Sequence, residues 1–323
     1  PLWDGFIQKI LPDSEVRRLV LEYLGYTLLS DTRFQVAQFW VGSGANGKST
    51  LAEIVAAVHQ KTVSVSIEDL GGFAAGAIIG ASLVTVDETP PRIDEQRLKS
   101  MISGDPVSID RKFKELVTVC PTAKWIIRGN SAPQVSDQTD GFWRRLHVID
   151  FTTKIPEDER DDLLAEKIVE QELGGVVFQI LSHLSNLLRR GRFGELPKAV
   201  QETKRRMRTE TNSLLGWVDT FSPTIGDREQ AVPSDSVYQH YRRWCQDNGY
   251  SPVAVNKFWM QLQMHMPGVD KWQARAVDPD TGDSRVTRLC NVVLDAPAPF
   301  AEQSVRLAGG APKVVPLRLP PAS

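Results

Sequence analysis

Apolar residues at helical spacing open the chain, and short continuous apolar runs follow them. Between Leu2 and Leu29 the spacing predicts two helices separated by a break at Pro12, with Gly25 ending the second. The later runs are short and rich in β-branched residues, which is typical of strands buried in a parallel sheet. They lie at residues 35–41, 63–67, 81–87, 124–130 and 146–151. The pattern therefore predicts an α/β fold with a small helical collar in front of it.

Helical periodicity returns after the last of these runs. Apolar residues at helical spacing predict helices from residue 156 to about residue 190, and a charged helix follows over 197–212. That helix carries a basic cluster, for which a solvated helix face is a better explanation than contact with nucleic acid. The cluster consists of Lys204, Arg205, Arg206 and Arg208.

Residues 213–295 have the pattern of a small separate domain. Two helices precede two strand-like runs at 271–277 and 284–294, and this order suggests a winged helix. Its aromatic residues are better explained as core than as stacking platforms, and the domain could contact either DNA or protein. The basic residues available for DNA phosphates are Lys257, Arg275, Arg285 and Arg288. Residues 296–323 are proline-rich and are expected to form a disordered tail or linker.

Composition narrows the class of protein. The 323 residues exceed one ordinary domain, and no apolar run reaches membrane-spanning length. A formal net charge of −2 means that any nucleic-acid site must be a local patch. The three cysteines are isolated, which suits a reducing cytosol, and we expect a cytoplasmic protein of a bacterial host cell. Because the chain begins at Pro1 without methionine, we expect it to be a fragment or a processed form.

The stretch FWVGSGANGKST, from Phe39 to Thr50, carries the strongest chemical signal. It fits the phosphate-loop pattern G-x-x-x-x-G-K-[ST] and lies between a predicted strand and a predicted helix over 51–58. Lys48 would reach the β- and γ-phosphates of ATP, and the Ser49 hydroxyl would bind Mg²⁺. The alternative is a chance glycine-rich turn before a helix. The nucleotide-binding residues predicted in this way are Gly42, Ser43, Gly44, Ala45, Asn46, Gly47, Lys48, Ser49 and Thr50.

Polar residues end three of the other predicted strands or flank them. Asp87 and Glu88 follow one strand, where Asp87 could hold Mg²⁺ and Glu88 could orient or deprotonate the attacking water. Asn130 ends another strand and could sense the γ-phosphate. Arg144 and Arg145 precede the last strand and could reach phosphate, usually that of a neighbouring subunit. The plainer alternatives are a turn cap for the acidic pair and surface ion pairs for the arginines.

The order and spacing of these motifs resemble those of superfamily 3 helicases, in particular the helicase part of phage and plasmid primase–helicases, which is similar to the poxvirus primase–helicase. The resemblance covers about residues 15 to 155. It is carried by Gly25 to Leu28, Gly42 to Thr50, Asp87-Glu88, Leu98 to Asp105, Gly129 to Pro133 and Gly141 to Phe151. Residues 61–80 match nothing useful in that family.

The resemblance implies an AAA+-type P-loop core, a homo-oligomeric and usually hexameric ring, and ATP sites at subunit boundaries. It implies that Lys99 reaches a neighbour's nucleotide, and we favour Arg144 slightly over Arg145 as the arginine finger. Residues 108–117 have the pattern of a strand, a tight basic turn and a second strand. The resemblance implies that this hairpin points into the ring channel and grips single-stranded DNA; the alternative is an ordinary exposed hairpin with solvated lysines. The hairpin residues assigned to DNA are Arg111, Lys112, Phe113 and Lys114.

The sequence as a whole predicts an ATP-dependent DNA helicase that moves 3′ to 5′ on single-stranded or forked DNA in phage or plasmid replication. A primase–polymerase domain is expected before Pro1. Two alternatives stay open: a replication initiator or loader that does not unwind, and a winged-helix DNA-binding regulator with a degenerate ATPase. The expected domains are a collar (1–35), a superfamily 3 core (36–155), a helical segment (156–212), a winged-helix-like domain (213–295) and the tail (296–323).

Overall fold

The structure is a computed structural model that describes residues 1–67, 70, 73–87, 94–111, 114–130, 140–277, 284–294 and 306–307. The chain divides into two compact units, Pro1–Thr211 (unit 1) and Asn212–Ser323 (unit 2). No helix within the described ranges is long and apolar enough to cross a membrane.

Unit 1 is built on a five-stranded sheet with the strand order β2-β3-β6-β1-β7, in which every neighbouring pair is parallel. The sheet confirms the predicted parallel α/β core. Its strands are β1 (Ala37–Val41), β2 (Thr62–Ser64), β3 (Leu83–Val86), β6 (Lys124–Gly129) and β7 (Leu146–Asp150). Because β6 lies between β1 and β3, the Asn-ended strand separates the phosphate-loop strand from the acidic strand.

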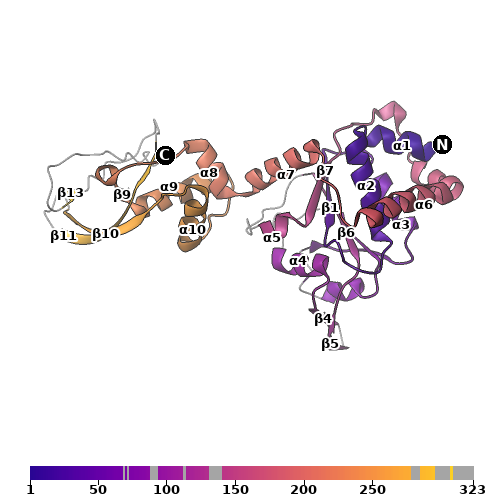
Figure 1. The fold of residues 1–323 in the computed structure, drawn as a ribbon, viewed down its shortest axis with the longest axis horizontal. Helices are drawn as coiled ribbons and strands as arrows, with labels where there is room; N and C mark the ends of the chain where they lie inside the picture. Colours follow the sequence, from indigo (N-terminus) through magenta and orange to yellow (C-terminus); the bar gives the residue numbers. More distant parts are fainter. Residues whose placement is uncertain are drawn as a thin grey trace. The chain divides into compact units, whose positions relative to one another are not determined.

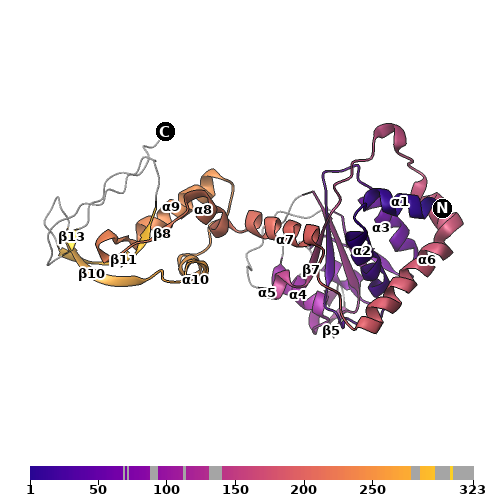
Figure 2. The ribbon, with the colours of Figure 1, turned by 45° about the horizontal axis from the view of Figure 1, so that its top comes forward.

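Helices cover both faces of this sheet (Figures 1 and 2). Figure 2 shows α1, α2, α3 and α6 on one face and α4 and α5 on the other. Buried residues alternate accordingly, because successive side chains of a strand point to opposite faces. On β1, Trp40 packs with the first group of helices, whereas Phe39 and Val41 pack with the second. The helices of unit 1 are α1 (Leu2–Ile10), α2 (Ser14–Thr27), α3 (Lys48–Ala57), α4 (Glu95–Ser103), α5 (Asp140–Trp143), α6 (Leu164–Arg190) and α7 (Lys198–Thr211), with 3₁₀ turns η2 (Phe73–Ile78) and η3 (Glu157–Glu159).

The contact between α2 and α6 corrects one sequence-based expectation. Gly25 does not end α2, which continues to Thr27. Instead, a Cβ added at Gly25 would lie 2.7 Å from Leu184 Cβ and 2.8 Å from the carbonyl oxygen of Ile180. Glycine at this position therefore permits the close approach of two helices rather than a helix stop.

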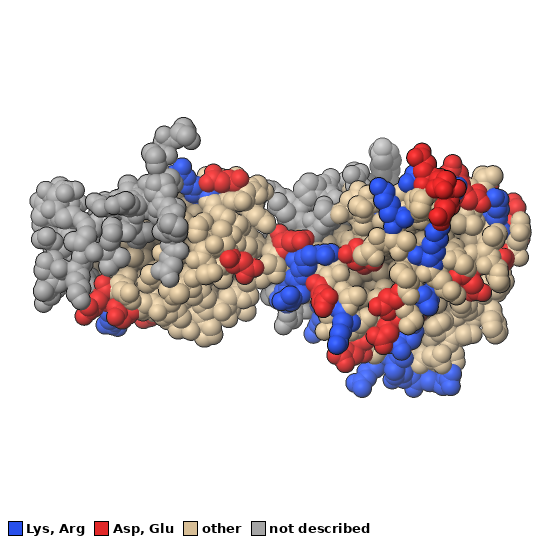
Figure 3. All heavy atoms as spheres, turned by 90° about the horizontal axis from the view of Figure 1, so that it is seen from above, with Lys and Arg blue, Asp and Glu red and all other residues tan. Residues whose placement is uncertain are grey.

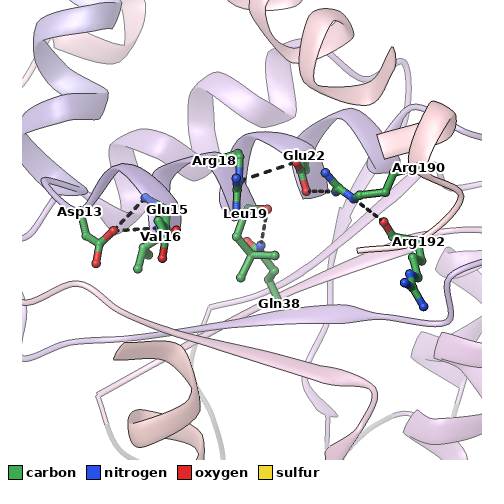
Figure 4. Close-up of polar contacts among 9 residues, drawn as sticks. All are labelled: Asp13, Glu15, Val16, Arg18, Leu19, Glu22, Gln38, Arg190 and Arg192. Atoms are coloured by element: carbon green, nitrogen blue, oxygen red, sulfur yellow. Dashed lines mark hydrogen bonds and ion pairs between the residues drawn. The ribbon is translucent and has the colours of Figure 1, made fainter. Parts of the chain in front are cut away.

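A buried carboxylate fixes the same pair of helices (Figure 4). Glu22 on α2 is only 3% exposed, and its two oxygens lie 2.7 Å from an Arg190 nitrogen and 3.9 Å from Arg18 Nε. Gln38 on β1 donates to the carbonyl oxygen of Leu19 at 3.4 Å, which ties α2 to the sheet. The helices before the phosphate loop thus pack on the sheet as part of unit 1.

A two-stranded antiparallel hairpin extends from the body of unit 1 (Figure 1). It consists of β4 (Val107–Arg111) and β5 (Lys114–Val119), with an irregular register between Ile109 and Arg111. Its base is anchored, because Ile109 is fully buried and Arg97 of α4 donates to the carbonyl oxygen of Ser108 at 2.9 Å. The predicted hairpin is therefore present, rooted in the core at its amino-terminal strand.

The described residues of unit 2 form three helices around an aromatic core and a long antiparallel strand pair. The core is centred on Trp217, Tyr241 and Phe258. Its elements are α8 (Ser213–Phe221), β8 (Thr224–Ile225), η4 (Arg228–Gln230), β9 (Val232–Pro233), α9 (Ser234–Asp247), α10 (Val255–His265), β10 (Lys271–Val277), β11 (Ser284–Cys290), β12 (Val292–Val293) and β13 (Arg306–Leu307). β10 and β11 pair along their whole lengths. Apart from β13, the expected tail lies outside the described residues.

Candidate nucleotide site

The phosphate loop joins the carboxyl end of β1 to α3. Gly47 has a φ of +79°, a left-handed conformation that glycine adopts without strain, and it precedes the first helical residue, Lys48. A Cβ at Gly47 would lie 2.6 Å from Ile10 Cγ2, so α1 packs directly behind the loop. No side chain caps the start of α3, which leaves its first backbone N–H groups available to an anion.

Lys48 is folded back onto its own loop. Its ammonium donates to the Gly42 carbonyl oxygen at 2.8 Å and to Asn46 Oδ1 at 3.1 Å. Burial lowers the pKa of Lys48, nearby Arg128 lowers it further, and Asp150 opposes the shift. The lysine is therefore close to charged residues at the ends of β6 and β7.

The rest of the loop is braced by the chain that follows β7. Asn46 is buried and donates to the Phe151 carbonyl oxygen at 3.2 Å, and Ile155 N–H donates to the Ala45 carbonyl oxygen at 2.8 Å. The Asn46 side chain thus supports the loop from within. The remaining predicted loop residues vary in exposure: Ser43, Ala45 and Ser49 are exposed, and Gly44 and Thr50 are half-buried.

Asp87 lies directly after β3 and is 54% exposed. Its two oxygens have different partners: Arg128 of β6 forms an ion pair with one, and Ser64 Oγ of β2 donates to the other at 2.9 Å. Glu88, its predicted catalytic neighbour, lies outside the described residues.

The carboxyl ends of the strands bring these groups to one edge of the sheet. Trp40 pairs with Arg128 and Val86 pairs with Ile127, so Arg128 and Asp87 occupy adjacent positions on neighbouring strands. Ile127 and Val86 pack on the face of α4 and α5. By alternation, Arg128 and Asp87 turn to the opposite face, from which α3 and Lys48 approach. Such an edge is where ligands bind in open parallel sheets.

Asn130 and Lys99 lie at the positions predicted for them. Asn130 is exposed directly after β6, one strand from both β1 and β3. Lys99 is half-buried on α4. Among the residues that the structure describes, neither side chain has a contact that assigns it a role.

The two adjacent arginines differ sharply. Arg145 donates to Ser103 Oγ at 2.7 Å, to the Gly141 carbonyl oxygen at 2.5 Å and to Gln35 Oε1 at 3.2 Å. Burial is the main cause that lowers its pKa. Arg144 is exposed. Arg145 is therefore held by contacts within its own chain, which distinguishes it from the exposed Arg144.

Two of the residues predicted to bind DNA belong to the described strands of the hairpin. Arg111 ends β4 and Lys114 begins β5, while Lys112 and Phe113 between them lie outside the described residues. Close to this end, Leu116 is 64% exposed, whereas Val117 and Val119 of the same strand pack against the core of unit 1. Acidic and basic side chains are interspersed over most of the face of unit 1 that Figure 3 shows.

Other predicted basic residues are partly engaged. Arg206 of α7 forms ion pairs with Asp150 at 2.8 Å and Glu210 at 3.8 Å, so this part of the α7 cluster contacts unit 1 itself. On unit 2, Arg275 and Arg288 are exposed, and the register of β10 and β11 places them on the same face of the strand pair.

The residues present fit a magnesium-bound triphosphate. An uncapped helix start follows a glycine turn, Ser49 is exposed on its first turn, and the Asp87 carboxylate lies at the same edge of the sheet. These are the hydroxyl and carboxylate oxygens that Mg²⁺ prefers.

Sequence reasoning missed three residues at this edge: Arg128, Ser64 and Asp150. Arg128 stands two residues before Asn130 and Asp150 ends β7, so the rule that was applied to Asp87 could have selected both. Ser64 offers no such signal, because a lone serine at the end of a short strand is common.

Two family models match the chain. A family of unknown function, DUF5906, matches residues 40–145, which include the phosphate loop, Asp87 and Arg144. The Poxvirus D5 protein-like family matches residues 213–289, most of unit 2 before its last strands.

Curated viral proteins match over most of the chain. A putative helicase of Acanthamoeba polyphaga mimivirus, L207/L206, is 25% identical over 76% of this chain and 28% of its own length. A putative primase of African swine fever virus, C962R, is 22% identical over 72% of this chain and 26% of its own. The chain thus spans about a quarter of the length of these relatives.

Among solved structures, the apo C-terminal region of NrS-1 has a similar fold. It is 16% identical and aligns with a TM-score of 0.51 over 90% of this chain and 76% of its own. The similarity extends to both units, since the aligned share exceeds unit 1 alone.

Proposed function

The chain is a superfamily 3 primase–helicase-like protein, and from this premise we propose that it is an ATP-dependent DNA helicase. It moves 3′ to 5′ on single-stranded DNA and acts in phage or plasmid replication, as the C-terminal part of a primase–helicase. The observation that supports this most is the shared sheet edge at which Lys48, Arg128 and Asp87 lie around the start of α3.

In this proposal each residue at the edge has a distinct task. The phosphate loop, Gly42 to Thr50, cradles the phosphates through backbone N–H groups, and Lys48 leaves its own loop to bind them. Ser49 and Asp87 hold Mg²⁺, which supplies neutralisation of phosphate charge. Glu88 orients the attacking water, and Asn130 senses the γ-phosphate.

Hydrolysis requires a neighbouring copy of the chain. Arg144 is exposed and unencumbered by the contacts that fix Arg145, which supports its use as a finger on a neighbour's nucleotide. Lys99 supplies a second contact of this kind. The assembly is a homo-oligomer, and a hexameric ring suits the family.

DNA contact is assigned to the hairpin β4–β5. Basic residues at its end meet phosphates and Phe113 packs on sugar or base, which is how strands are held without sequence preference. Unit 2 serves as a winged-helix-like module and the helices of residues 1–35 as a collar, with a primase–polymerase domain in front of them. The setting is the cytosol of a bacterial host.

The decisive experiment measures ATP hydrolysis and strand displacement on forked DNA for the wild type and Lys48→Ala. We expect both activities in the wild type and neither in the variant, because Lys48 is the cation that binds the transferred phosphate. ATP hydrolysis without displacement would support a loader instead. DNA binding that is unchanged by ATP and by Lys48→Ala would support a regulator.

The hairpin assignment is tested separately. The double substitution Lys112→Ala with Lys114→Ala should leave basal ATP hydrolysis within about twofold and abolish its stimulation by single-stranded DNA, because it removes two phosphate contacts. Unchanged stimulation would refute the hairpin as the DNA grip while leaving the nucleotide site intact.

A further inference from the structure

Arg128 forms the ion pair that best defines the candidate nucleotide site. Its guanidinium contacts one oxygen of Asp87, and Ser64 Oγ donates to the other oxygen at 2.9 Å. The Arg128 side chain is 16% exposed and that of Asp87 is 54% exposed, so the arginine is held by the protein and the carboxylate faces outward. The carboxylate proposed to serve Mg²⁺ is therefore already paired with the positive charge of Arg128.

The lysine of the same site is also satisfied internally, by the Gly42 carbonyl oxygen and Asn46 Oδ1. In this form both groups needed by a magnesium triphosphate are engaged with the protein. A divalent cation approaching Asp87 alone would meet the positive charge of Arg128, and like charges at contact distance repel strongly in a partly buried site.

The position of β6 gives Arg128 access to two neighbours. β6 pairs with β3 on one side and with β1 on the other, and Arg128 is opposite Trp40 of the strand that leads into the phosphate loop. Asp87 is therefore beside Arg128 on one side and the loop that holds phosphates is on the other. The planar guanidinium of arginine can form two parallel hydrogen bonds with either a carboxylate or a phosphate group.

We propose that Arg128 is a positioning residue that occupies the metal-binding carboxylate in the nucleotide-free protein and turns to phosphate oxygens when a triphosphate arrives. This rests on the proposed ATP site. Asp87 becomes available to a cation only when a triphosphate is present to receive Arg128. Metal and nucleotide therefore bind as a coupled pair, and the free protein has little affinity for the metal alone.

The test measures Mn²⁺ binding by electron paramagnetic resonance, with and without a non-hydrolysable ATP analogue. In the wild type, Mn²⁺ should bind more tightly when the analogue is present. The increase should exceed what the binding of Mn²⁺ to the free analogue accounts for. Arg128→Gln should tighten the binding of Mn²⁺ alone by about tenfold or more, since one adjacent positive charge is lost. The same variant should reduce the coupling between metal and analogue.

Three control variants locate the effect. Arg33→Gln removes an arginine that is paired with Asp31 before β1, remote from the carboxyl edge, and should leave Mn²⁺ binding unchanged. Arg128→Lys keeps the charge and should keep the low affinity for Mn²⁺ alone. Adding Asp87→Asn to Arg128→Gln should remove the newly gained binding.

The outcomes separate this inference from the proposed function. A wild type that binds neither the analogue nor its Mn²⁺ complex would overturn the ATP site itself. A wild type that binds Mn²⁺ alone as tightly as with the analogue would overturn the inference without any variant, even if Arg128→Gln does not fold. A folded Arg128→Gln whose affinity for Mn²⁺ alone equals that of the wild type would do the same.

Discussion

Arg144 and Arg145 show how two adjacent, identical residues acquire different roles. Arg145 donates three hydrogen bonds that join α4, the α5 segment and Gln35, whereas Arg144 is exposed. Of the two side chains, that of Arg145 therefore supports the fold, whereas that of Arg144 contributes little buried contact.

Arg145→Ala should lower the free energy of unfolding by about 2 kcal/mol, because several partly buried hydrogen bonds are lost. Arg144→Ala should change it by less than about 0.5 kcal/mol, as is usual for an exposed residue. Urea unfolding measures both.

If Arg144 acts on a neighbour's nucleotide, Arg144→Ala should reduce ATP hydrolysis on the order of 10³-fold. Mixing it with Lys48→Ala subunits should then restore part of the activity, because one mixed interface in the ring carries both intact residues. A stable Arg144→Ala protein with normal hydrolysis would contradict the finger assignment.

His147 links a single buried residue to the pH dependence of stability. It lies on β7, is 4% exposed and packs edge-on against Phe193 at 5.0 Å between ring centroids. Burial, with a smaller contribution from Lys204, lowers its pKa from 6.5 to about 3. The folded protein thus keeps this imidazole neutral at pH values where the unfolded chain protonates it.

The contribution of His147 to the free energy of unfolding is therefore constant above the unfolded pKa of 6.5. It falls progressively as the pH is lowered toward 3, because only the unfolded chain takes up the proton in that range. Between pH 6.5 and pH 5 the loss should be about 2 kcal/mol from this residue. His147→Gln should show a shallower fall in unfolding free energy over that range, measured by urea titration at each pH. Parallel profiles for the two proteins would show that His147 is not responsible.

At the scale of elements, Gly25 and the glycines of α6 occupy contrasting environments. Gly25 is pressed against Leu184 and Ile180, whereas a Cβ at Gly174 or Gly175 would meet no atom within 4 Å. The same substitution should therefore have opposite effects in two helices that pack together.

Gly25→Ala should destabilise unit 1 by about 2 kcal/mol, because the overlap outweighs the gain of about 1 kcal/mol in helix propensity. Gly174→Ala, the matched control, should stabilise by up to about 1 kcal/mol. Thermal and urea unfolding distinguish the two. Equal stabilisation by both substitutions would mean that α2 and α6 separate easily.

The elements also show what a single sequence can predict. The phosphate loop was located because Gly42, Gly47, Lys48 and Ser49 have a fixed spacing between a strand and a helix. The ion pair of Arg128 with Asp87 could not be found in this way, because it spans 41 positions and depends on which strands are neighbours. From the sequence, Gly25 was predicted to end a helix, which is a local role. In the structure it permits close contact with α6, whose contacting residues lie more than 150 positions later in the sequence. The spacing of nearby residues was thus sufficient to predict the phosphate loop, but it did not predict the order of the strands or the packing of the helices.

At the scale of the whole molecule, the boundary between the units falls between two helices. α7 ends at Thr211, and Asn212 caps α8 by accepting hydrogen bonds from the N–H groups of Leu214 and Leu215 at 2.9 and 3.2 Å. Unit 2 thus begins with its own helix cap and has its own core around Trp217.

A fragment beginning at Asn212 should fold independently and unfold cooperatively, because its helices and the β10–β11 pair share one core. Near-ultraviolet circular dichroism and a thermal melt test this, with Trp217→Ala as a variant that should remove the transition. A fragment without a cooperative transition would show that unit 2 needs unit 1 to fold.

The connection between hairpin and sheet is short. β5 ends at Val119 and β6 begins at Lys124, and both Pro121 and Ala123 in the link are buried. The hairpin is thus joined through a short, partly buried link to β6, the strand that carries Arg128 and precedes Asn130. A load applied at the hairpin would pass along the axis of β6. β6 is hydrogen-bonded to β3 on one side and to β1 on the other. A force along its axis is therefore a shear force, and β6 can slide only if the hydrogen bonds to both neighbouring strands break at the same time.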